Sequence, residues 1–156
     1  MSIKSLGKIA AVAAAAGLVL TGCANDDANQ ARAQEETCGV LLGASNKANE
    51  AASRAMQVGE SGGPRAARVI ESAALDLRNH SFDRSDDEKV PGTDEPVALR
   101  TMLQVQAELY DEMADAIEND PAAMNSMNPE DVEVNGMTIT EANEIVGTYC
   151  GPYFNS

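Results

Sequence analysis

Residues 31–58 read ARAQEETCGVLLGASNKANEAASRAMQV and contain no proline. Small and apolar side chains recur in this segment every three or four residues, a spacing that predicts one face of a single long helix. The face consists of Cys38, Leu41, Ser45, Ala48, Ala52 and Ala55, with Leu42 and Met56 beside it. Because most of these side chains are small, neighbouring helices can pack closely against them. The glycine-rich segment 59–63 (GESGG) predicts the end of this helix.

Three further helices are expected downstream. They span residues 64–80, 96–119 and 141–150. Pro64 and Pro96 stand at the first position of two of them, where proline is well tolerated. Pro121 is expected to stop or kink the third helix of the chain, and Thr140 is expected to cap the fourth. The expected apolar faces include Ala66, Ile70, Ala73 and Leu77, then Leu99, Met102, Leu103, Leu109, Met113 and Ala116, then Ala142, Ile145, Val146 and Tyr149. The methionines on the apolar faces, Met56 included, are expected to be core residues.

The segments between these helices differ in character. Residues 81–95 form an acidic, polar loop. Asn135-Gly136 separates two alternating segments, 131–134 and 137–140, and an Asn-Gly pair in this setting is the strongest short signal for a β-hairpin. The chain is therefore predicted to fold into one all-α domain over residues 31–156. We expect a four-helix up-down-up-down bundle with a small β-hairpin inserted before the last helix.

The charge balance excludes several classes of function. The chain carries 25 acidic and 11 basic side chains, for a formal net charge of −14. A nucleic-acid-binding protein, or a protein that adheres electrostatically to anionic lipid, needs a basic surface. The sequence also contains no nucleophile-elbow, zinc-protease, P-loop or dinucleotide motif. We therefore expect a protein that is not an enzyme and does not bind nucleic acid.

The N-terminus has the three parts of a bacterial export signal. Lys4 and Lys8 precede an apolar run over residues 9–20, which is too short to cross a bilayer as a helix. The run ends in Leu20-Thr21-Gly22-Cys23, which resembles the lipobox of bacterial lipoproteins. The resemblance implies cleavage directly before Cys23, whose thiol then receives a diacylglycerol.

The same resemblance divides the chain into parts. Residues 1–22 are the signal peptide, residues 23–30 a short polar tether, and residues 31–156 the folded body. The lipid then holds the protein at the extracytoplasmic face of the cell membrane, because the acidic body is repelled by an anionic surface. The alternative is an ordinary secretory signal with a chance cysteine. In composition, the alanine-rich leader and the acidic body resemble those of actinobacterial lipoproteins.

Two cysteines remain once Cys23 carries the lipid. Cys38 and Cys150 form an even pair in an extracytoplasmic protein, which favours a disulfide. Cys38 lies near the start of the first expected helix and Cys150 at the end of the fourth, and those positions meet at one end of an up-down-up-down bundle. The alternative, a redox-active thiol pair, lacks the C-x-x-C spacing. We therefore predict one structural disulfide.

Three groups of side chains are candidate metal or cofactor ligands. His80, the only histidine, is either a structural or surface residue at a helix end or a metal or haem ligand. Met124 and Met127 are either adaptable filler or a copper(I) site. Asp83-x-Ser85-x-Asp87 is either a solvated linker or part of a calcium loop. The structural interpretation is favoured for each, so no metal or cofactor is expected.

The last candidate site is aromatic. Tyr149, Tyr153 and Phe154 lie close together near the end of the chain. They either close the end of the bundle beside the disulfide or form an exposed patch that binds a partner. The second possibility makes them a candidate partner-binding site.

These observations lead to two functional hypotheses. The first is a non-enzymatic accessory or interaction subunit of a membrane or envelope complex, held close to its protein partner by the short tether. The alternative is a carrier that holds haem, a lipid or a metal between its helices. The chain resembles small secreted helical haem binders of actinobacteria only in size, location and cysteine placement, and His80, Tyr110 and Tyr149 do not make a convincing ligand set. A carrier needs a sizeable internal apolar cavity, whereas an accessory subunit needs a packed core and an exposed apolar patch.

Overall fold

The computed structural model describes residues 13–90, 95–122, 128 and 133–154, with side chains from Ala28 to Tyr153 within these ranges. The chain divides into two units, Met1–Glu35 and Glu36–Ser156. Its helices are α1 (Ala13–Val58), the 3-10 helix η1 (Glu60–Gly62), α2 (Gly63–Phe82), α3 (Leu99–Asn119) and α4 (Ile139–Phe154). Its strands are β1 (Lys89–Val90), β2 (Val97–Ala98), β3 (Glu133–Val134) and β4 (Met137–Thr138). Within the described ranges, no helix is long and apolar enough to cross a membrane.

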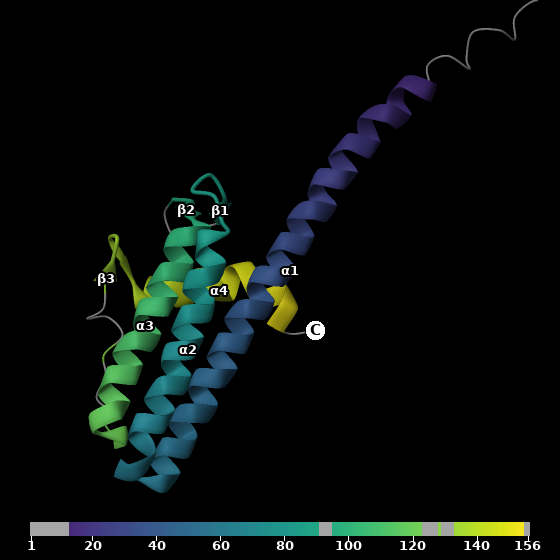
Figure 1. Cartoon of the computed structure of the whole chain (residues 1–156). Helices are drawn as coiled ribbons and strands as arrows, with labels where there is room; N and C mark the ends of the chain where they lie inside the picture. The colour runs from purple at the N-terminus through teal and green to yellow at the C-terminus, as the bar shows by residue number, and fades with distance from the viewer. Residues whose placement is uncertain (1–12, 91–94, 123–127, 129–132, 155–156) are drawn as a thin grey trace, which may run out of the picture. The chain divides into compact units, whose positions relative to one another are not determined.

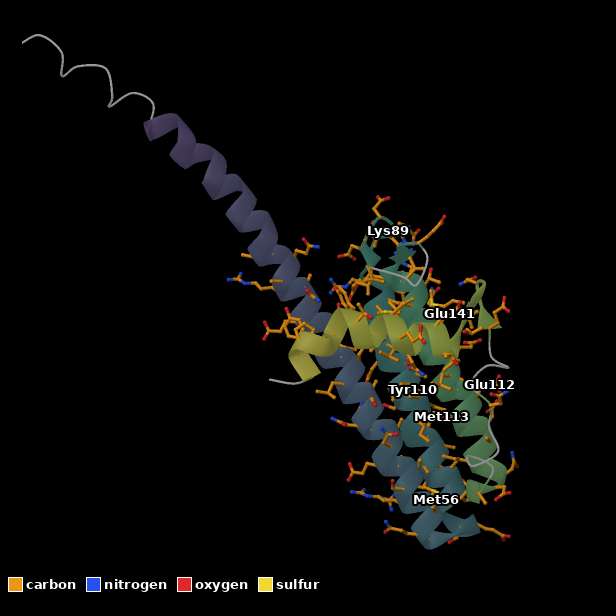
Figure 2. All side chains as sticks on the ribbon, turned by 180° about the vertical axis from the view of Figure 1, so that it is seen from behind. Met56, Lys89, Tyr110, Glu112, Met113 and Glu141 are labelled. Carbon is orange, nitrogen blue, oxygen red and sulfur yellow. A yellow bond between two sulfur atoms is a disulfide. The ribbon has the colours of Figure 1, made fainter. Side chains whose placement is uncertain are left out.

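Four α-helices dominate the described residues, which confirms the predicted all-α class. In the second unit, the Glu36–Val58 part of α1, then α2 and α3, run in alternating directions (Figure 1). The β3–β4 hairpin precedes α4, as predicted. α4 lies crosswise to the other helices in both views (Figure 1 and Figure 2). The predicted disulfide between Cys38 and Cys150 joins α4 to α1.

Residues 23–30, which are expected to be a tether, are helical and belong to α1, while their role as a tether stays a prediction. No glycine or proline lies between Cys23 and Cys38 to stop the helix. Alanine, the strongest helix former, recurs among the polar side chains of this segment. As a helix the eight residues rise only about 12 Å, instead of the roughly 28 Å that an extended chain would reach.

The core combines a small face on α1 with larger side chains from the other elements. Ala48, Ala52 and Ala55 of α1 are buried, as their spacing predicts. The largest fully buried side chains are Ile70, Leu77, Met102, Leu103, Ile117, Ile139, Val90 and Val105. A side-chain hydrogen bond between the buried Tyr110 of α3 and Ser45 of α1 ties these two helices together. Small side chains on α1 thus allow bulky ones to fill the space between the helices.

The prediction that Met56 is a core residue is wrong. Its side chain is 49% exposed, whereas Met102 and Met113 are buried as expected. Figure 2 shows Met56 near the end of α1 that α4 does not cross. This side of α1 therefore remains open to solvent in its last turns.

A two-stranded pair lies at the edge of the segment predicted as an acidic loop. β1 pairs antiparallel with β2, with Lys89 opposite Ala98 and Val90 opposite Val97. The side chain of Val90 is fully buried, which anchors the segment on the core. Strands of two residues are too short to produce a recognisable alternation in the sequence.

The β3–β4 hairpin confirms the prediction from Asn135-Gly136. β3 and β4 pair antiparallel, with Val134 opposite Met137. Asn135 and Gly136 have φ angles of 53° and 78°, and two successive left-handed residues are what a type I′ turn requires. Residues 131 and 132, which were also expected in the first strand, lie outside the described ranges.

The ends of α4 differ from the prediction by a few residues. The backbone N–H of Glu141 donates to Thr138 Oγ1 at 3.2 Å, and the N–H of Thr138 donates to Glu141 Oε2 at 2.9 Å. This reciprocal capping box makes Thr138, rather than Thr140, the cap of the helix. At the other end α4 continues beyond Cys150 through Pro152. A proline in the last turn removes only one backbone donor, so the helix tolerates it there.

α2 approaches the end of α3 closely at Gly63. A Cβ added to Gly63 would lie 2.5 Å from the carbonyl oxygen of Ile117 and 3.0 Å from that of Glu118. Gly63→Ala should therefore lower the free energy of unfolding by about 1–3 kcal/mol, because the backbone of α3 must shift. Urea unfolding followed by circular dichroism measures this change.

Gly147→Ala in α4 is the matched control, since a Cβ at Gly147 meets nothing within 4 Å. This variant should leave the stability unchanged or raise it by up to about 1 kcal/mol, the helix-propensity difference between the two residues. Equal effects of the two substitutions would contradict the close approach at Gly63.

Candidate functional site

The disulfide connects two buried positions on helices that are distant in the sequence. Cys38 of α1 and Cys150 of α4 are both almost fully buried, and their Cα atoms are 5.5 Å apart. The pair spans a sequence separation of 112, so it closes most of the second unit into one loop. With both thiols bonded and buried, the prediction of a structural disulfide is confirmed.

Next to Cys38 lies a group of polar side chains, here called the junction cluster: Glu36, Thr37, His80, Arg84 and Glu88. Thr37 Oγ1 and His80 Nε2 are hydrogen-bonded at 3.0 Å. Arg84 Nη2 lies 3.3 Å from Glu36 Oε2, and Nη1 lies 3.7 Å from Glu88 Oε1. The buried Nε of Arg84 has no hydrogen-bond partner in the described part of the chain. These contacts fasten α1 to the C-terminal end of α2.

His80 is held neutral by its surroundings. Burial lowers its pKa below the ordinary value of 6.5, and the neighbouring Arg84 guanidinium lowers it further. The carboxylates of Glu36, Asp83 and Glu88 act in the opposite direction without reversing the shift. Within the described ranges, no group of three or more His, Cys, Asp and Glu side chains is placed to hold a metal ion. The hydrogen bond to Thr37 therefore favours the structural interpretation of His80 over the ligand one.

The aromatic residues near the C-terminus lie at the edge of the core. Tyr149 and Tyr153 are half-buried and pack against the hydrophobic core. Burial raises the pKa of Tyr149, and the Glu88 carboxylate contributes in the same direction. The side chain of Phe154 lies outside the described side chains. This packing favours tyrosines that close the end of the bundle, while the partner-binding patch at Tyr149, Tyr153 and Phe154 stays a prediction.

The remaining candidates do not form a recognisable ligand site. In the acidic segment, Ser85 Oγ accepts a hydrogen bond from the Asp87 N–H at 3.1 Å. The N–H of Ser85 donates to Glu88 Oε2 at 3.2 Å, so this segment is a turn fastened by its own side chains. The side chains of Asp83 and Asp87 are exposed. Met124 and Met127, the candidate copper ligands, lie outside the described residues.

A groove runs along the outer seam between α1 and α2, and we call it the α1–α2 groove. It consists of two adjoining hollows of about 360 Å³ and about 370 Å³ that share Lys47. Its small lining residues are Gly43, Ala44, Ala51, Ala55, Gly62 and Ala66. Apolar walls are provided by Val40, Val58 and Val69. The charged lining residues are three basic ones, Lys47, Arg54 and Arg65, and three acidic ones, Glu50, Asp76 and Asp83. Lys47 pairs with Asp76 across the seam where the two hollows meet, and Arg54 pairs with Glu50. The groove is thus two shallow, partly apolar hollows with charged side chains of both signs.

Sequence reasoning missed this groove, although the charges carry a signal for it. Residues 43–70 contain four basic and two acidic side chains, whereas residues 71–156 contain four basic and nineteen acidic ones. The net charge of the whole chain hides this reversal. A comparison of charge along the sequence, rather than its sum, would have pointed to the connection between α1 and α2.

Two features are therefore open to functional interpretation in the described part of the chain. The groups of the junction cluster largely satisfy one another, whereas the α1–α2 groove is open to solvent. Comparison of the chain with protein-family models, curated proteins and solved structures gave no match.

Removal of the disulfide tests its structural role. The double variant Cys38→Ala with Cys150→Ala should lose up to about 4–5 kcal/mol of unfolding free energy, because a cross-link across this separation strongly restricts the unfolded chain. Chemical unfolding followed by circular dichroism measures the loss. Ser53→Ala, at an exposed position of α1, is the control and should unfold like the wild type. An unchanged midpoint for the double variant would contradict the role assigned to the bond.

His80 should make the protein less stable in mild acid. Its pKa is lowered in the folded state, so the unfolded chain binds the proton first as the pH falls below 6.5. The free energy of unfolding of the wild type should therefore decline, relative to that of His80→Gln, as the pH falls from neutral through 6.5. Parallel urea titrations of the two proteins measure the difference. A wild-type advantage that grows on acidification would contradict a buried neutral histidine.

Proposed function

We propose that this protein is a lipid-anchored, non-enzymatic interaction subunit at the extracytoplasmic face of a cell membrane. Leu20-Thr21-Gly22-Cys23 supports the anchor, because its residues have the pattern of a lipobox after a short apolar run. A buried disulfide supports an oxidising compartment, since such bonds are rare in reducing cytoplasm. In this proposal, residues 1–22 are removed and Cys23 carries the lipid.

The observation that carries the interaction role is the location of the open space. The core between the helices is filled by fully buried side chains such as Ile70, Leu103 and Ile117. The two hollows of the groove lie instead on the outer seam of α1 and α2. Large apolar side chains are also exposed on both helices: Leu42, Met56, Val58, Val69, Leu75 and Phe82. Open apolar surface around a filled core suits a subunit that binds another protein.

A carrier function has less support from the side chains that would hold the cargo. His80 is engaged by Thr37, and Tyr110 is buried and hydrogen-bonded to Ser45. Side chains that are already bonded within the protein are also poorly placed to act in catalysis, which supports a protein without catalytic activity. Both remaining thiols are bonded to each other, and the only imidazole is buried and neutral.

Cys23→Ala tests the anchor. The wild type should fractionate with membranes, whereas the variant should be released or accumulate as the unprocessed precursor, because the lipid can no longer be attached. Asn25→Ala is the control, since it changes a nearby side chain and leaves the lipobox intact. Fractionation, immunoblotting and intact mass of the mature chain measure the outcome. Equal membrane retention of Cys23→Ala and wild type would contradict the proposal.

A further inference from the structure

We propose that Asn135, in the turn between β3 and β4, is a site of spontaneous covalent modification that loosens the start of α4. Its side-chain amide is lost as ammonia, and a fraction of the molecules is then linked through the side-chain carbon of residue 135 instead of the main-chain carbon. This modification does not depend on the proposed interaction function, because its only co-reactant is water.

The reaction converts the asparagine to an acid by way of a cyclic imide. The main-chain nitrogen of Gly136 attacks Cγ of Asn135, so a new C–N bond forms and the bond from Cγ to Nδ2 breaks. Nδ2 leaves as ammonia and takes up the proton of the Gly136 N–H. Water then opens the imide at either of its carbonyls. Opening at Cγ gives an aspartate with an unchanged main chain, whereas opening at the main-chain carbonyl gives a β-aspartyl bond.

Asn135 is better placed for this reaction than the other asparagines of the described residues. Asparagine is a thermolabile residue, and Asn135 is the only one in the sequence that precedes a glycine, which has no side chain to hinder the attacking nitrogen. Both turn residues are exposed to water. Within the described part of the chain, no hydrogen bond holds the amide of Asn135. Asn143, by contrast, lies inside α4 and accepts a hydrogen bond from Gln106 at 2.9 Å.

The turn can open while the rest of the molecule stays folded. It holds Asn135 in the left-handed conformation, with φ at 53°, and the main chain must rotate before the nitrogen of Gly136 can reach Cγ. The strands on either side contain two residues each and pair only with one another. Such a pair has little stability of its own, so its local opening costs less free energy than global unfolding. The folded turn therefore slows the reaction without preventing it.

The β-aspartyl product alters the main chain, whereas the aspartate product only adds a negative charge. A β-aspartyl bond inserts an extra carbon atom into the turn, and the geometry of a short turn fixes the register of the strands that it joins. Val134 and Met137 are paired directly beside this turn, and the side chain of Met137 is buried. The next residue, Thr138, forms the capping box with Glu141. A lengthened turn therefore displaces the cap at the start of α4.

The opposite end of α4 is held by a bond that the modification does not touch. Cys150 is joined to Cys38 of α1 by the disulfide. The loosening is therefore confined to the hairpin and the first turn of α4, and it increases with the age of the molecule because the reaction is slow.

The test follows the full-length protein during incubation in warm, mildly alkaline buffer prepared with heavy-oxygen water. Peptide mass spectrometry with electron-transfer fragmentation locates each new acid and distinguishes the two products. The mass gain of an amide-to-acid conversion, with heavy oxygen incorporated, should appear at residue 135 while Asn143 remains an amide. Asn135→Gly is the matched control, because a Gly-Gly pair supports the same type of turn and residue 135 then has no amide to lose.

The modified protein shows whether the start of α4 is loosened. After chromatographic separation, the β-aspartyl form should exchange its amide hydrogens between Thr138 and Glu141 faster than the unmodified protein. Exchange around Ile70, in the buried part of α2, should be unchanged. Asn135→Asp carries the added charge on an unaltered main chain and should exchange like the wild type.

Three results would overturn the proposal. Asn135 keeps its amide for as long as Asn143 does, or the acid forms at residue 135 only after the protein has been unfolded in urea. In the third, the separated β-aspartyl form exchanges at the start of α4 as slowly as the unmodified protein.

Discussion

The Cys38–Cys150 disulfide fixes the C-terminal part of α4 against α1 across a sequence separation of 112. α4 makes this bond while lying crosswise to the other helices (Figure 2). The junction cluster lies next to Cys38 and fastens the end of α2 to the same part of α1, through the Thr37–His80 hydrogen bond and the ion pairs of Arg84. Two independent kinds of bond thus meet at the same part of α1: the disulfide holds α4 there, and the junction cluster holds the end of α2.

The second constraint is the small size of the residues on α1. Alanines on its inner face let the larger side chains of α2 and α3 fill the core, and those at its edge leave the α1–α2 groove open. The absence of a side chain at Gly63 likewise allows α2 to approach the end of α3 closely. A helix with small residues on more than one side packs closely with its neighbours and still offers a surface to a further helix. The close packing of the helices and the open hollows of the groove therefore have one physical origin in the sequence.

The fold was largely predictable, whereas the groove was not. Helix periodicity, the prolines near helix ends and the Asn135-Gly136 turn depend on local sequence, and local sequence predicted the helices and the hairpin. Local sequence misled at Met56, which has the spacing of a core residue, yet its side chain is 49% exposed because burial depends on which elements pack against that turn of α1. The conformation of residues 23–30 was not predicted, although nothing among their polar side chains stops a helix. The groove depends on tertiary packing, and its only signal in the sequence is the reversal of charge around Arg54 and Arg65.

The proposed lipid anchor, the buried side chains of the core and the exposed apolar surface of α1 and α2 support the proposal of a protein that acts by contact with another protein. The most direct measurement is native mass spectrometry of the tagged full-length protein, expressed in its own cells and extracted from their membrane fraction in mild detergent. The account predicts that the wild-type protein is recovered with a stoichiometric protein partner. A wild-type protein that leaves the membrane alone, or with haem, lipid or metal bound in place of a protein, would contradict it.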